Sequence, residues 1–230
     1  MHLDKLRHEV LEANLELIRR GLVVYTFGNA SGISREDGLV VIKPSGVPFD
    51  ELTPENMVVT DLDGRVVEGN LRPSSDLDTH VLLYKSLPDI GGVVHTHSRY
   101  ATAWAQSGRE IPCFGTTHAD YYHGCVPVTE SLSDEEIGGE YELNTGHAIL
   151  RRLSAIDPAT APGILVRSHG PFAWGKTAPK AAQNAVLLEE IAAIAYHTVV
   201  LNPHATAIPQ ALHDRHFLRK HGKNATYGQG

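Results

Sequence analysis

The chain has 230 residues, of which 20 are lysine or arginine and 27 are aspartate or glutamate, so its formal charge is −7. This balance argues against a nucleic-acid binder, because contacts with phosphates need clustered lysine and arginine. Apolar residues make up 42% and charged residues 20% of the sequence, as in folded soluble domains. The charged start, MHLDKLRHEV, argues against a signal peptide, and no run of about 18 apolar residues predicts a membrane span. We therefore expect a cytoplasmic protein without a membrane partner.

The first part of the sequence predicts one helix followed by strands. Apolar residues recur at steps of three and four over residues 3–17, which predicts an amphipathic helix, and Gly21 predicts its end. Over residues 23–67, short apolar runs alternate with glycine, aspartate and proline. Asp63–Gly64 between two such runs is typical of a hairpin, so we expect antiparallel sheet in this part of the chain.

The second part predicts helices that alternate with short strands. The segment PSSD at residues 73–76 offers side chains that cap a helix through about residue 85, and Ser98 precedes a second helix in the same way. Pro179 opens the longest helix. In chain order, the predicted elements are a strand at 91–97, a helix at 100–107, a strand at 125–128, a helix at 144–153, a strand at 163–170 that runs into a turn, and helices at 179–202 and 209–218. These elements predict one α/β domain over residues 1–230.

Histidine is unusually frequent, with 14 in the chain, and three of them point to a metal site. His95 and His97 stand two apart in a predicted strand, so their side chains leave the same face. His169 ends another predicted strand, where a turn aims its ring at the same cleft, and Asp76 is a candidate fourth, oxygen ligand. Three imidazoles with at most one carboxylate suit zinc, and the lack of cysteine ligands favours a catalytic ion. The alternative is a chance pairing of histidines, because short motifs often mislead.

Three short loops have the composition that a phosphorylated substrate needs. They are Gly28–Asn29, Ser45–Gly46 and Ser74–Ser75, which offer backbone donors and hydroxyls, and Lys43 lies nearby in the sequence to supply charge. Each pair alone is explained equally well by an ordinary turn. Their coincidence with the histidines favours one site for a metal and a phosphate.

Longer motifs resemble those of the class II aldolase/epimerase family. The similarity spans essentially the whole chain, in the motifs TFGNASGI, IKPSG, PSSDLDTH, GGVVHTHSRYATAWAQ, THADYYHG, SHGPFAWGK and KHGKNATYGQ. The resemblance implies a single three-layer α/β/α domain with a largely antiparallel central sheet. It also implies a homotetramer with fourfold symmetry, sites at subunit interfaces and one zinc ion per subunit.

The same resemblance gives roles to individual residues. It assigns zinc to His95, His97 and His169, with Asp76 as a candidate fourth ligand. Asp120 and Tyr227 match two proton-transfer residues of the family, although their spacing alone would suggest a surface carboxylate and a frayed chain end. The residues that the resemblance implies for the sugar phosphate are Gly28, Asn29, Lys43, Ser45, Gly46, Ser74, Ser75 and, near the same pocket, His216.

The implied activity is that of a zinc-dependent epimerase, which interconverts L-ribulose 5-phosphate and D-xylulose 5-phosphate at C4 by breaking and re-forming the C3–C4 bond. Asp76 favours this activity over that of a fuculose-phosphate-type aldolase, which places glutamate there, because the shorter side chain leaves the aldolase base out of reach. A class II aldolase or related sugar-phosphate lyase is the alternative. A binding module like the adducin head is a further alternative, but it would lack the metal histidines. The residues do not separate an arabinose from an ascorbate or a xylulose route.

Overall fold

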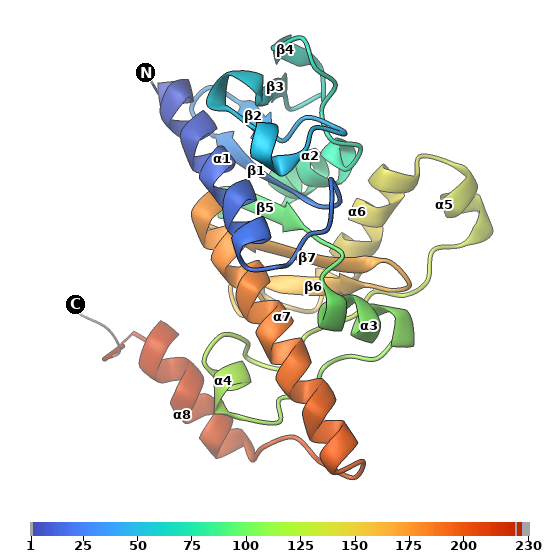
Figure 1. Cartoon of the computed structure of the whole chain (residues 1–230). Coiled ribbons are helices and arrows are strands. Elements are labelled where there is room, and N and C mark those ends of the chain that lie inside the picture. Colours follow the sequence, from blue (N-terminus) through green and yellow to red (C-terminus); the bar gives the residue numbers. More distant parts are fainter. Residues whose placement is uncertain (1, 224, 227–230) are drawn as a thin grey trace.

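The computed structural model describes residues 2–223 and 225–226, whose strands form a seven-stranded antiparallel sheet (Figure 1). The strands are β1 (Asn29–Ser34), β2 (Leu39–Ile42), β3 (Val58–Asp61), β4 (Val66–Glu68), β5 (Gly92–His95), β6 (Gly163–Val166) and β7 (Gly170–Gly175). Their order across the sheet is β4-β3-β2-β1-β5-β7-β6. Strand β5 therefore lies between β1 and β7, and the centre of the sheet joins distant parts of the chain.

Helices cover both faces of this sheet. On one face lie α1 (His2–Arg19) and α7 (Ala178–Leu201), and on the other lie α2 (Leu77–Ser86) and α6 (Tyr141–Leu153). The other described helices and 3-10 turns are α3 (Arg99–Ser107), α4 (Thr116–Ala119), α5 (Asp134–Gly138), α8 (Gln210–His221), η1 (Phe49–Glu51) and η2 (Pro54–Asn56). The predicted three-layer α/β/α class with a largely antiparallel sheet is confirmed.

The sequence of the strands explains these layers. Val40 and Ile42 pack in the core beneath α2 and α6, whereas Val41 between them packs in the core beneath α1 and α7. Val93 and Val94 of β5 divide in the same way. Successive side chains of a strand leave opposite faces, so a sheet covered on both faces requires continuous apolar runs such as these.

Helix α7 is the longest described helix and also the most apolar. Within the described part of the chain, it is the one helix that is long and apolar enough to cross a membrane by length and composition. Its first buried residues, such as Ala181 and Ala185, lie in the core shared with α1, whereas Leu188 and Ile191 pack in a cluster with α3. Of its most apolar stretch, 33% is buried inside the structure.

Two sequence predictions in the loops are wrong. Residues 23–27 begin the stretch predicted as antiparallel sheet but form a loop, with Tyr25 83% exposed and at a positive φ of 54°. Residues 125–128 form no strand either, because their two pairings, Ile111 with Val126 and Val128 with Leu165, are isolated bridges to different partners.

Three predicted boundaries of helices and strands differ from those in the structure. Strand β5 ends at His95, because the chain then turns into α3, so His97 lies beyond the strand. Helix α6 begins at Tyr141 and not at residue 144, where the Asn144 amide instead donates to the carbonyl oxygen of Glu136 and ties α6 to α5. Helix α8 continues to His221.

The side chain of Asn14 links α1 to the beginning of β1 through hydrogen bonds. Its Nδ2 donates to the carbonyl oxygens of Val10 at 2.8 Å and Ala30 at 3.1 Å, and its Oδ1 accepts from the N–H of Ala30 at 2.9 Å. Both Asn14 and Ala30 are fully buried, so these bonds satisfy groups that water does not reach. The position of the neighbouring Asn29 depends on this contact.

Replacing Asn14 by alanine leaves the N–H and C=O of Ala30 without these partners. We expect Asn14→Ala to lower the free energy of unfolding by about 2–4 kcal/mol, because each buried unsatisfied polar group costs about 1–3 kcal/mol. Glu12→Ala, on the exposed side of the same helix, is the control and should change this free energy by less than about 0.5 kcal/mol. Denaturant unfolding followed by circular dichroism measures both, and equal effects would contradict the argument.

Candidate metal centre

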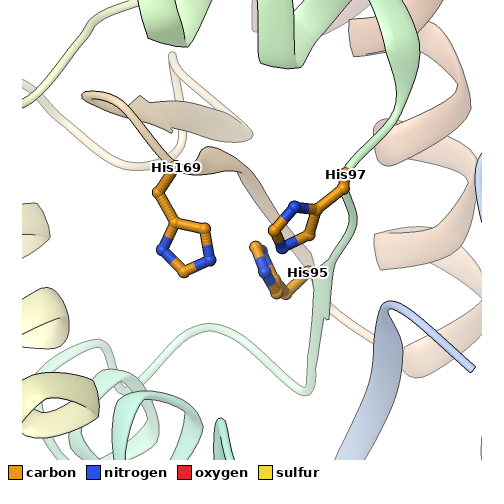
Figure 2. A group of neighbouring side chains, drawn as sticks. All are labelled: His95, His97 and His169. Atoms are coloured by element: carbon orange, nitrogen blue, oxygen red, sulfur yellow. The ribbon is translucent and has the colours of Figure 1, made fainter.

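Three histidine rings meet where β5 ends beside the turn between β6 and β7, and Figure 2 shows them facing one another. One nitrogen from each of His95, His97 and His169 lies within 4.8 Å of the other two. His95 is the last residue of β5, His97 stands in the segment before α3, and His169 stands in the β6–β7 turn. The structure thus brings the three predicted rings together, although His97 reaches the group from beyond the strand.

Hydrogen bonds at the second ring nitrogen orient two of these histidines. His95 Nδ1 lies 3.0 Å from the carbonyl oxygen of Pro171. Because a carbonyl only accepts, the His95 proton sits on Nδ1 and Nε2 keeps its lone pair. The ring also stacks on Phe172 at a centroid distance of 4.2 Å, and His169 Nδ1 lies 3.2 Å from the hydroxyl of Tyr141. Such partners fix the ring of a metal-binding histidine.

The electrostatics of the group favour neutral rings. Burial, followed by the nearby imidazoles of His95 and His97, lowers the pKa of His169 to about 4. Burial and the imidazole of His95 also lower the pKa of His97. Neutral imidazole is the form that binds a metal ion. The donor atoms, their spacing and their protonation therefore fit a divalent ion of the zinc type.

The β6–β7 turn carries local strain beside His169. Ser168 has a φ of +61°, which is costly for a residue other than glycine. At Gly170, a Cβ atom would lie 2.6 Å from the carbonyl oxygen of Thr96. Only glycine at this position lets the turn approach the end of β5 so closely, and that approach brings His169 to His95.

A cavity of about 370 Å³ opens over the three histidines. The three predicted loops line it together with Lys43 and Asp76, so its predicted lining residues are Gly28, Asn29, Lys43, Ser45, Gly46, Ser74, Ser75, Asp76, His95, His97 and His169. The two serine loops are joined by backbone bonds, from Ser45 N–H to the Arg72 oxygen and from Ser74 N–H to the Lys43 oxygen. The histidines and the loops therefore form one site.

Further residues line the same cavity that the sequence did not single out. They are Thr26, Phe27, Pro44, Tyr141 and Glu142. Tyr141 and Glu142 open α6, which packs against α2. Their only sequence signal was the glycine pair just before them, which is typical of a helix boundary and says nothing about a site.

Lys43 places a positive charge at the wall of the cavity. Its side chain is buried, and its Nζ donates to the carbonyl oxygens of Val47 at 2.7 Å and Pro44 at 3.2 Å. The ammonium also lies 4.8 Å from the centroid of the Phe49 ring. Burial lowers the pKa of Lys43 to about 8, so the group is still mainly protonated at pH 7. A cation beside serine hydroxyls and backbone N–H groups suits a bound phosphate.

Asp76 stands at the N-cap position of α2, yet its side chain makes no capping bond. Its Oδ2 instead accepts from Nδ2 of Asn29 at 2.5 Å, and the same amide donates to the Ser74 hydroxyl at 3.0 Å. Burial raises the pKa of Asp76, but the neighbouring imidazoles of His95 and His80 and the bond from Asn29 outweigh it, so the pKa lies below its ordinary value. The carboxylate lies outside the group of three nitrogens, so a fourth ligand at Asp76 stays a prediction.

Glu189 of α7 caps α3. Ser98 occupies the N-cap position but makes no side-chain capping bond. Glu189 Oε1 accepts from the N–H of Tyr100 at 2.8 Å, and its Oε2 accepts from the N–H of Ala101 at 2.9 Å. A carboxylate at a helix N-terminus satisfies unpaired donors and interacts well with the helix dipole. Since α3 begins two residues after His97, this contact also fixes the end of the histidine segment.

Removal of this cap is expected to destabilise the protein. Glu189→Ala should lower the free energy of unfolding by about 1–2 kcal/mol, as does the loss of a helix cap. The neighbouring Glu190 is exposed, so Glu190→Ala should change this free energy by less than about 0.5 kcal/mol. Denaturant unfolding of the two variants makes the comparison, and equal stability would show that the cap contributes nothing.

Asp120 and His216 lie together but do not line the cavity of the same chain. His216 Nδ1 lies 3.0 Å from Asp120 Oδ1, while Arg219 Nη2 and Lys220 Nζ lie 3.1 Å and 3.2 Å from the carboxylate. Burial raises the pKa of Asp120, but hydrogen bonds from His216, Lys220 and Arg219 outweigh it and hold the pKa below its ordinary value. Tyr227, the second predicted proton-transfer residue, lies outside the described residues.

Sequence and fold both match one class of proteins. Residues 8–196 match the profile of the family described as class II aldolase and adducin N-terminal domain. The antiparallel sheet and the three-histidine group agree with the resemblance found in the motifs. The chain therefore belongs to the class II aldolase and adducin family.

Individual relatives make the comparison more specific. The chain is 55% identical to the L-ribulose-5-phosphate 4-epimerase UlaF of Salmonella paratyphi B over 227 residues, which cover 99% of this chain and 100% of the relative. The solved structure of an L-fuculose 1-phosphate aldolase superposes with a TM-score of 0.78 at 26% identity, covering 92% of this chain and 94% of that one. An L-fuculose-1-phosphate aldolase from Thermus thermophilus has a TM-score of 0.69 at 24% identity and covers 87% and 98%, which supports the fold alone.

Proposed function

We propose that this protein is a zinc-dependent epimerase that interconverts L-ribulose 5-phosphate and D-xylulose 5-phosphate at C4. The observation that carries the proposal is the 55% identity to an L-ribulose-5-phosphate 4-epimerase along the whole of both chains. A class II aldolase is the second candidate, favoured by the likeness to an L-fuculose 1-phosphate aldolase. Asp76 favours the epimerase, because the aldolases that the sequence resembles place glutamate at that position.

The substrate itself requires that a carbon–carbon bond break. The hydrogen at C4 lies β to the C2 ketone and is not acidic, so inversion at C4 does not proceed by removing it. Zinc held by His95, His97 and His169 would polarise the C2 carbonyl and accept the charge released when the C3–C4 bond breaks. Lys43 and the serine loops hold glycolaldehyde phosphate by its phosphate while the aldehyde turns its other face. Renewed formation of the bond then gives the C4 epimer.

Two residues are needed to move protons. The C4 oxygen points in opposite directions before cleavage and after recombination, so each face of the aldehyde needs its own proton carrier. We assign these roles to Asp120 and Tyr227. The pKa of Asp120 lies below its ordinary value, so the carboxylate is ionised at neutral pH, which is the form that accepts a proton, although the lowered pKa also makes it a weaker base. Proton transfer of this kind typically contributes about 10²–10⁴ in rate.

We further propose that residues 1–230 form one domain, that four copies assemble with fourfold symmetry in the cytoplasm, and that neighbouring copies share each site. The support is geometric, because Asp120 and His216 do not line the cavity of their own chain. An acid on the far face of the substrate is most easily supplied across an interface. Head-to-tail contacts in a closed ring repeat such a shared site around the axis.

Product analysis with L-ribulose 5-phosphate tests the reaction. We expect D-xylulose 5-phosphate without net release of glycolaldehyde phosphate, and we expect deuterium placed at C4 to stay in the product, because the C4–H bond does not break. Mass spectrometry and NMR of the products measure both. Net release of the aldehyde would identify an aldolase, and complete loss of deuterium to water would contradict C3–C4 cleavage.

Metal analysis tests the three-histidine site. The purified protein should contain about one zinc per subunit, and His97→Asn should lose most of it, because one of three nitrogen ligands is gone. The exposed His204 offers a control, since His204→Asn should keep the metal and the activity. Plasma mass spectrometry gives the zinc content. Full zinc occupancy and full activity in His97→Asn would refute the site.

A mixture of two inactive variants tests the shared site. His97→Asn and Asp120→Asn are unfolded together in equal amounts and refolded. About a quarter of the sites should then combine an intact metal side with an intact acid side, because each cyclic interface draws its two halves from independently chosen chains. Activity that stays at the level of the separate variants, in oligomers whose reassembly is shown by mass, would place the whole site within one chain.

A further inference from the structure

A buried row of polar side chains runs behind the histidine site, and the proposed chemistry does not use it. Asp76, His80 and Tyr84 follow at steps of four residues from the N-cap of α2, so they lie on one face of that helix. His80, Tyr84 and Ser31 of β1 are fully buried. Ser31 Oγ lies 2.7 Å from His80 Nδ1 and 2.8 Å from the Tyr84 hydroxyl.

Counting the available protons shows which group donates in each hydrogen bond of this row. If the Tyr84 hydroxyl donates to Ser31 and Ser31 donates to Nδ1 of His80, both hydroxyl protons are used. The neutral His80 ring then carries its own proton on Nε2. In the opposite arrangement, His80 Nδ1–H would donate to Ser31 and Ser31 would donate to the Tyr84 hydroxyl. The proton of that hydroxyl and the lone pair of His80 Nε2 would then both lack a partner, whereas the first arrangement leaves only the Nε2–H without one.

The end of the row is an unpaired donor beside the site. His80 Nε2 is buried and has no hydrogen-bond partner in the described part of the chain. Asp76, one helical turn closer to the cavity, is the carboxylate whose charge acts on His80. The Phe172 ring meets His80 edge-on at 6.1 Å and stacks on His95, so the row is packed directly against the metal site. A buried N–H without an acceptor destabilises the folded protein and is rare in native structures.

We propose that His80 is the positioning residue of Asp76: its Nε2–H donates to the Asp76 carboxylate when a metal ion occupies the site, and it holds that carboxylate in one orientation. Asn29 already holds the carboxylate through Oδ2, so the two donors restrain it from two sides. Tyr84 and Ser31 act through His80 by fixing its tautomer. The inference rests on the proposed function, because Asp76 needs such restraint only at a working metal site.

Two substitutions of His80 distinguish a role of its Nε2–H donor from a role in packing alone. The side-chain amide nitrogen of glutamine takes the place of Nε2 of a histidine ring, whereas that of asparagine takes the place of Nδ1. His80→Asn should therefore weaken zinc binding about 10–100-fold, as does the loss of other partners of metal ligands. His80→Gln should weaken it less than about threefold, since the donor remains. Competition with a chelator measures the affinity, and thermal unfolding of the metal-free proteins shows that the variants fold.

A double-mutant cycle tests whether His80 acts through Asp76. In an Asp76→Asn background, His80→Asn should change zinc affinity less than about twofold, because the group it positions is already altered. An equal loss in both backgrounds, or an equal loss in the asparagine and glutamine variants, would overturn the inference. If His80→Asn does not fold, Ser31→Ala takes its place in the cycle with the same expected non-additivity, because it removes the hydroxyl that selects the tautomer.

A second readout does not depend on zinc. Nitrogen-15 NMR of the metal-free protein should show His80 neutral with its proton on Nε2, and a proton on Nδ1 would overturn the inference. A wild-type protein that binds no zinc, with His80 nonetheless protonated at Nε2, would refute the proposed function and leave the direction of the row established.

Discussion

The pairing of β5 with β1 on one side and with β7 on the other determines the geometry of the site. In this register, His95 lies opposite Asn29 of β1 and opposite Phe172 of β7. The His95 ring, the amide that holds Asp76 and the turn that carries His169 therefore reach the same end of the sheet. A shift of one residue would turn His95 to the opposite face and separate these groups.

Two helices that begin at the site do not use their own N-cap side chains. Asp76 and Ser98 stand at N-cap positions without capping, and α3 is capped instead by Glu189 from α7. Asp76 is thereby free to line the cavity. Departures from local preference are expected at functional sites, where other parts of the protein supply the lost stability.

The sequence predicted the parts of the site that depend on local pattern. The spacing of His95 and His97 indicated a shared group, and the glycine and serine loops indicated the wall of the cavity. The strand ends before His97, however, so this ring reaches the group from the segment that follows β5 and not from the face of the strand. The places of Tyr141 and Glu142 depend on the packing of α6 against α2, which no local pattern encodes.

The same distinction holds for the fold. Apolar runs predict strands such as β5, because Val93 and Val94 serve the two cores, whereas β7 (Gly170–Gly175) is not among the predicted strands. The apolar run around Tyr25 is typical of a strand, yet it forms a loop. No local pattern predicts the cap from Glu189 either, because the carboxylate and the helix whose N–H groups donate to it are about ninety residues apart in the chain.

The burial of Lys43 links the folding equilibrium to pH. Its pKa is about 8 in the folded protein and 10.5 as an ordinary lysine, so between these values the unfolded chain binds more protons than the folded one. The free energy of unfolding therefore rises as the pH increases through that interval. Below the interval, the lysine is charged in both states and the folded protein bears the full cost of burying that charge. At neutral pH the folded protein therefore carries this charge at a cost in stability, and the same charge lies at the wall of the cavity, where an anionic ligand would meet it.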